Sequence, residues 1–68
     1  MVREGEILDV IKECEECIKE LSFLTVWKLK DGRYAICSLT SSGFFKVFEL
    51  HDSFEFAINN ALFWDKML

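Results

Sequence analysis

The dipeptide Asp31-Gly32 lies between two runs rich in strand-forming residues, and it restricts the fold of this chain more than any other feature. Asp-Gly is typical of the type I′ turn of a β-hairpin, in which both central residues need positive φ. We therefore expect antiparallel strands at residues 23–30 and 33–39, joined by a loop of two residues.

A second turn follows one strand later, at residues 41–43. Its sequence, Ser-Ser-Gly, suits a loop of three residues whose glycine adopts the left-handed conformation. The loop leads into a third strand at residues 44–50. Together the two loops predict four opposed pairs across the strands: Trp27–Ile36, Val26–Cys37, Ile36–Phe48 and Cys37–Val47.

Helices are predicted on both sides of these strands. In residues 4–21, apolar residues recur every three or four positions, as in an amphipathic helix: Ile7, Ile11, Cys14, Ile18 and Leu21. Residues 53–68 form the second predicted helix. Asp52 is its expected N-cap, with Glu55 as the partner three residues later in a capping box.

The order of these elements is helix, three strands, helix. We therefore predict one small α+β domain over residues 1–68. It has two layers in an α-β-β-β-α arrangement, with a three-stranded antiparallel meander flanked by an N-terminal and a C-terminal helix.

Strand alternation divides the side chains of the meander between two faces. One face is apolar over most of its area and should contact the helices. The other carries an apolar cluster at one end: Leu24, Val26, Cys37, Leu39, Phe45 and Val47. Two arrangements are compatible with this pattern, since either each face contacts one helix, or both helices cover the first face and the cluster remains uncovered.

The C-terminal helix is apolar on two sides. One stripe can contact the sheet: Phe54, Ala57, Ile58, Ala61, Leu62 and Leu68. Phe56, Phe63 and Met67 lie roughly opposite it, at about 100° per residue. A single core accounts only for the first stripe, so the second stripe predicts a binding partner.

Composition supports the same interpretation, because 51% of the 68 residues are apolar and 15% are aromatic. A chain of this length buries only about 60% of the surface that its unfolded form exposes. We therefore expect a homo-oligomer, most simply a homodimer. The candidate contact residues come from the outer helix stripe and from the second sheet face: Phe56, Phe63, Met67, Leu24, Val26, Leu39, Phe45 and Val47.

The charge balance leaves a different kind of partner open. Twelve acidic against eight basic residues give a net charge of −4. An acidic binding module is the alternative, an inhibitor or adaptor for another macromolecule of the kind that mobile elements encode. Nucleic acid is disfavoured as a partner, because phosphate binding depends on clustered lysine and arginine. The basic residues at the hairpin tip (Lys28, Lys30 and Arg33) are too few to reverse this.

We expect no secretory signal, because residues 1–6 lead directly into a charged helical pattern, and no apolar run approaches the ~20 residues that span a bilayer. Its three cysteines, an odd number, suit a reducing compartment. We expect a cytoplasmic protein without a membrane partner. The absence of glutamine, with frequent lysine and glutamate, is also a trend of proteins from hot environments.

Cys14 and Cys17 form a CxxC pair, which is half of a common zinc site and the centre of many redox sites. In the predicted helix both lie on the apolar stripe, so they are interpreted as core residues, and a metal or thiol site is a minor alternative. Zinc would also need Cys37 and His51, but Cys37 is predicted on the face away from the first helix. No nucleophile is arranged with His51. We therefore expect no enzyme activity and no cofactor.

Overall fold

A computed structural model describes all 68 residues and contains one antiparallel sheet of four strands, flanked by helical segments. The elements in chain order are α1 (Val10–Glu13), β1 (Cys14–Glu20), β2 (Leu24–Leu29), β3 (Tyr34–Leu39), β4 (Phe45–His51) and α2 (Phe54–Met67). Neighbours in the chain are also neighbours in the sheet, in the order β1-β2-β3-β4. The α+β class is confirmed, and the predicted three-stranded meander between two helices is roughly consistent but differs in detail, because the sheet has a fourth strand and α1 is only one turn long.

The error concerns residues 4–21, of which only α1 is helical. Residues 14–20 form β1, an edge strand that pairs with β2. This pairing satisfies the backbone groups along that edge of β2, which a helix at residues 14–20 would leave without partners. The register of β1 shifts twice, between Cys14 and Glu16 and between Cys17 and Lys19. Each irregularity interrupts the alternation of side chains, so a bulged strand presents apolar residues three or four positions apart, as a helix does.

The register between β2 and β3 differs from the prediction by one residue. Val26 pairs with Ile36 rather than with Cys37. The loop contains three residues rather than two, because the Leu29 amide donates to the Arg33 carbonyl (2.8 Å) and the Gly32 amide to the Leu29 carbonyl (3.1 Å). Gly32 is left-handed (φ 94°), and only glycines in this chain have positive φ, so Asp31 does not. The glycine therefore closes a three-residue loop, and Asp31 avoids the strained conformation that a type I′ turn requires.

The second loop has the predicted form. Gly43 is left-handed (φ 88°), and the Thr40 amide donates to the Phe44 carbonyl at 2.7 Å. Cys37 pairs with Val47, as expected. A register shift after this pair places Ile36 opposite Glu49, so the predicted pairing of Ile36 with Phe48 was wrong.

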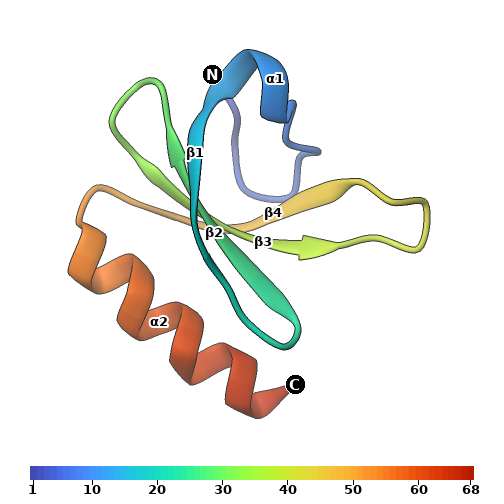
Figure 1. The fold of residues 1–68 in the computed structure, drawn as a ribbon, viewed down its shortest axis with the longest axis vertical. Coiled ribbons are helices and arrows are strands. Elements are labelled where there is room, and N and C mark those ends of the chain that lie inside the picture. The colour runs from blue at the N-terminus through green and yellow to red at the C-terminus, as the bar shows by residue number, and fades with distance from the viewer.

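Each face of the sheet is covered by a different part of the chain, as Figure 1 shows: α2 on one side and the N-terminal segment (residues 1–9) with α1 on the other. The core under α2 consists of Leu24, Val26, Ile36, Ala57 and Ala61. The core on the other side consists of Val2, Leu8, Cys14, Leu29, Ala35, Cys37 and Val47. Of the two predicted arrangements, the one that covers both faces is therefore closer to the structure.

The N-terminal segment lies along the outer edge of β4. The Leu8 amide donates to the Phe45 carbonyl (2.8 Å), and the Val47 amide donates to the Glu6 carbonyl (2.8 Å). These bonds leave β1 as the edge that no other segment pairs. Its exposed side chains are mostly charged, which opposes unwanted pairing with other strands.

Both ends of α2 are held by side-chain hydrogen bonds. At its start the Ser53 hydroxyl accepts from the Phe56 amide (3.4 Å), so the N-cap is Ser53 and the prediction of Asp52 was wrong by one residue. Near its end, the Asp65 carboxylate accepts from three successive amides of the turn between β1 and β2. These amides belong to Ser22 (3.2 Å), Phe23 (2.7 Å) and Leu24 (3.0 Å). Sequence reasoning did not identify this anchor, because its partners are more than 40 positions away.

Replacement of Asp65 by alanine is expected to lower the free energy of unfolding by about 2 kcal/mol, because three amides lose their charged acceptor. Asp65→Asn, which retains one oxygen, should lose less. Urea unfolding followed by circular dichroism measures both effects. Asp52→Ala is the matched control, since Asp52 is exposed and its carboxylate makes no hydrogen bond within the chain. Equal stability of the Asp65→Ala and Asp52→Ala variants would show that the anchor contributes nothing.

Candidate protein interface on α2

The side of α2 that faces away from the sheet carries large apolar side chains. Ala57 and Ala61 are fully buried against the sheet, whereas Phe56, Phe63 and Met67 are 66%, 54% and 67% exposed. At about 100° per residue, these three side chains and that of Asn60 fall within an arc of about 60°. The residues predicted to need a partner are thus uncovered in the single chain.

Aromatic contacts extend this surface from α2 to β4. The Phe63 and Trp64 rings meet edge to face, with centroids 5.2 Å apart, and Trp64 meets Phe48 in the same way at 5.6 Å. Such contacts hold the rings in defined orientations. Phe48 is itself 40% exposed. We call this surface the α2 patch, and it consists of Phe48, Phe56, Phe63, Trp64 and Met67.

Sequence reasoning did not include Phe48 and Trp64 in this surface. Trp64 could have been recognised, because a helical wheel places it beside the stripe of Phe56 and Phe63. Phe48 could not, because its place depends on the register shift in β4.

Three of the predicted contact residues are not available to a partner. Leu24, Val26 and Val47 are buried in the protein's own core. Their inclusion was wrong for two reasons. First, the one-residue register error placed Val26 on the same face as Cys37, whereas it shares a face with Ile36. Second, the N-terminal segment covers the face that contains Val47.

Two further predicted contact residues lie apart from the α2 patch. Leu39 is exposed on the side of the sheet that faces the N-terminal segment. Phe45 is half-buried there, edge to face with Trp27 at 5.2 Å. The structure therefore does not combine the helix stripe and the sheet cluster into one surface.

Charged residues accompany the α2 patch along one flank of the helix. Glu55 and Lys66 are exposed, and about 100° per residue places them within about 20° of each other around the helix axis. Neither forms a salt bridge, since the salt bridges of the chain are Lys28–Glu15, Arg33–Asp31 and His51–Glu49. The apolar surface is thus bordered by one acidic and one basic side chain without partners.

The cysteines do not form the CxxC arrangement that a helix would create. Cys14 is buried, Cys17 is exposed on β1, and Cys37 is buried in the same core as Cys14. The prediction that Cys37 lies on the opposite face was therefore wrong, again because of the register. No group of three histidine, cysteine, aspartate or glutamate side chains could hold a metal ion.

Burial makes these thiols poor nucleophiles. Burial raises the pKa of Cys14 to about 11 and that of Cys37 to about 12, and partial desolvation together with the nearby Glu20 carboxylate raises the pKa of the exposed Cys17. All three are then protonated near neutral pH, whereas metal binding and disulfide exchange require the thiolate.

The other candidate residues have partners within the chain. His51 Nε2 lies 2.9 Å from Glu49 Oε1 at the end of β4. At the hairpin tip, Lys30 Nζ donates to the Ile11 carbonyl (3.3 Å), and Arg33 Nη2 donates to the Val2 carbonyl (3.1 Å). These basic groups hold the N-terminal part of the chain in place and do not form a free basic surface.

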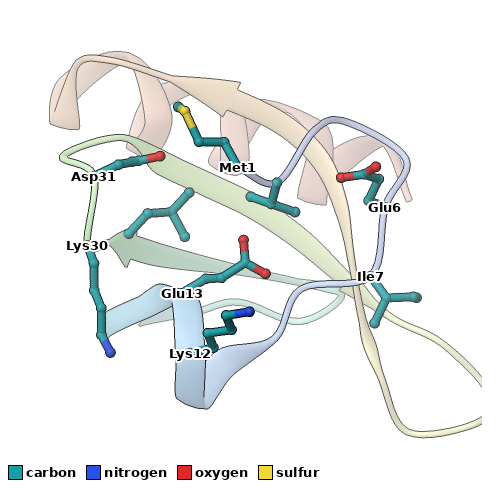
Figure 2. Close-up of a pocket in the computed structure, with 9 residues that line it drawn as sticks. Met1, Glu6, Ile7, Lys12, Glu13, Lys30 and Asp31 are labelled. Atoms are coloured by element: carbon teal, nitrogen blue, oxygen red, sulfur yellow. The ribbon is translucent and has the colours of Figure 1, made fainter.

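A cavity of about 610 Å³ lies between the N-terminal segment, α1 and the β2–β3 turn (Figure 2). The Glu13 carboxylate points into it, whereas the Lys30 ammonium group points away. Glu13 accepts a hydrogen bond from the Asp9 amide (3.3 Å) and Glu6 accepts one from the Arg3 amide (2.9 Å). The lining contains no histidine, cysteine, serine or threonine, and its ionisable side chains are those of Glu6, Lys12, Glu13, Lys30 and Asp31.

A second hollow, of about 450 Å³, lies between the N-terminal segment and the tip of the β3–β4 hairpin. Its lining is mostly apolar and includes Ile7, Ile11 and Phe44. It is on the side of the sheet opposite α2 and is separate from the α2 patch.

The fold and its surface thus define a small α+β domain with an uncovered aromatic helix face. No helix has the length and apolar character that a membrane span requires. Comparison of the chain with protein families, with curated proteins and with solved structures gave no significant match. Its function must therefore be inferred from the geometry and chemistry of the surface itself.

Proposed function

We propose that this protein is a non-enzymatic homodimerisation domain, in which the α2 patches of two copies pack against each other. The observation that carries the proposal is the exposure of Phe56, Phe63 and Met67 along one side of a well-anchored helix. Contiguous apolar surface in water is unfavourable, and aromatic residues and methionine are enriched at the cores of protein interfaces.

A second copy suits the patch because the patch is complementary to itself. Its centre is apolar except for Asn60, whose side chain donates a hydrogen bond to the Phe56 carbonyl, so two patches bury mainly apolar surface against each other. Its flank offers one negative and one positive side chain, Glu55 and Lys66, that lack partners within the chain. A partner protein whose surface carries charge of a single sign could form a salt bridge with only one of these two side chains.

Analytical ultracentrifugation at micromolar concentrations tests the proposal. The wild-type protein is expected to sediment as a dimer. Phe63→Glu should raise the dissociation constant at least about 100-fold, because two-fold symmetry brings two charges into an apolar contact. Phe63 is more than half exposed in the single chain, so circular dichroism should show that the variant retains the wild-type fold.

Phe44→Glu provides the matched control. Phe44 is the same residue type and is 57% exposed, but it lies at the β3–β4 turn beside the second hollow. This variant should remain dimeric. A monomeric wild-type protein would overturn the proposal, and dissociation by Phe44→Glu but not by Phe63→Glu would move the contact to the other side of the sheet.

A further inference from the structure

We infer that the two α2 helices pair antiparallel about a two-fold axis, and that reciprocal salt bridges between Glu55 of one copy and Lys66 of the other set their register. The inference rests on the proposed dimer and adds the orientation of the helices and the residues that specify it.

The spacing of the exposed stripe is that of a helix-pairing seam. Phe56, Asn60, Phe63 and Met67 follow one another at intervals of four, three and four, as a and d positions do in paired helices. The Asn60 side-chain amide donates to the Phe56 carbonyl (2.7 Å), so one of its N–H groups is paired within the seam. In an antiparallel pair, Phe56 meets Met67 of the other copy and Asn60 meets Phe63. The midpoint of this arrangement lies between residues 61 and 62.

The flanking charges have nearly the same midpoint. Glu55 and Lys66 lie about 16 Å apart along the axis, at a rise of about 1.5 Å per residue. Antiparallel helices bring equivalent flanks together, so each Glu55 faces the Lys66 of the other copy. The midpoint of the charged pair lies between residues 60 and 61, which leaves an axial offset of about 3 Å. Glutamate and lysine side chains are long enough to bridge it.

A parallel arrangement does not use these charges. It would bring the flank of Glu55 and Lys66 against the opposite flank of the other helix, where Trp64 lies and Ala57 is buried against the sheet. No salt bridge could form there, and the helix dipoles would be aligned unfavourably. The distribution of charge on α2 therefore favours the antiparallel pair.

Two charge-reversed variants test the orientation. Glu55→Lys places two lysines opposite each other at both ends of the proposed contact, and Lys66→Glu places two glutamates there. Each variant alone is expected to dimerise about tenfold more weakly than wild type, because two attractive pairs become repulsive. An equimolar mixture should form heterodimers well above the statistical half, because both pairs are attractive again. Native mass spectrometry, with one variant isotopically labelled, measures this fraction.

The double variant Glu55→Lys/Lys66→Glu separates pairing from effects on the helix itself. Both reversals oppose the helix dipole, so a loss caused by a weakened helix would be largest in the double variant. Restored salt bridges instead predict dimerisation close to wild type, and a heterodimer preference that declines with added salt.

Failure of this inference differs from failure of the proposed function. A wild-type protein that dimerises and dissociates with Phe63→Glu, but whose charge-reversed variants mix statistically, would overturn the antiparallel register and leave the dimer intact. A monomeric wild type would remove both.

Discussion

A rise in pH from 9 to 11 is expected to lower the free energy of unfolding by about 4 kcal/mol through two buried thiols. In the unfolded chain both thiols ionise near their ordinary pKa of 9.0. In the folded chain burial raises the pKa of Cys14 to about 11 and that of Cys37 to about 12. Folding therefore binds protons in this range, and the stabilisation is complete below pH 9 and is lost as the pH rises through 11 and 12.

Urea unfolding at fixed protein concentration and at several values between pH 8 and 11 measures this loss. The control is Cys14→Ala/Cys37→Ala, which should be less stable at pH 8 but should lose much less stability at pH 11. The two single variants divide the effect and remain informative if the double variant does not fold. An identical pH dependence in wild type and in all three variants would show that the thiols are not responsible.

Replacement of Ile36 by alanine is expected to lower the free energy of unfolding by about 4 kcal/mol, which is large for a domain of this size. Ile36 is fully buried at the centre of the sheet, beneath α2 and beside Val26. Truncation removes three carbon atoms from a site where strands on both sides limit relaxation. Chemical unfolding measures the effect. Ile11→Ala is the matched control, since Ile11 is 90% exposed and its truncation should change stability by less than about 0.5 kcal/mol.

The same substitution also tests the register between β2 and β3. Val26 and Ile36 are opposed on one face, so the Val26→Ala and Ile36→Ala effects should couple by about 0.5 kcal/mol or more in a double-mutant cycle. In the register predicted from sequence, Val26 opposes Cys37, and the Val26 and Ile36 side chains lie on different faces of the sheet. Strict additivity would therefore favour that register.

Strong local signals made part of this molecule predictable. The β3–β4 loop was predicted correctly, because a glycine at the third position of a three-residue hairpin loop readily adopts the left-handed conformation that this loop needs. The C-terminal helix was predictable for a similar reason, since its apolar spacing extends over four turns. The helix pattern was also sufficient to predict that Phe56, Phe63 and Met67 are exposed. A helix that buries Ala57 and Ala61 turns the three larger side chains away from the sheet.

The errors occurred where local signals were compatible with two structures. Asp31-Gly32 fits both a two-residue and a three-residue loop, and the difference of one residue exchanged the faces of the strands that it joins. Around Cys14 and Cys17, apolar spacing suited a helix as well as a bulged strand. The choice in favour of β1 came from the hydrogen-bonding edge of β2, which is remote in sequence from those cysteines.

By itself, the sequence determined the α+β class, three of the four strands and a helix with more apolar surface than one core can bury, because these follow from patterns within a single segment. The tertiary structure alone decided the fourth strand, the sheet register, the cover provided by the N-terminal segment and the anchoring of α2 by Asp65. These depend on hydrogen bonds and packing between distant segments, whose free energies exceed the small differences in local preference between helix and strand.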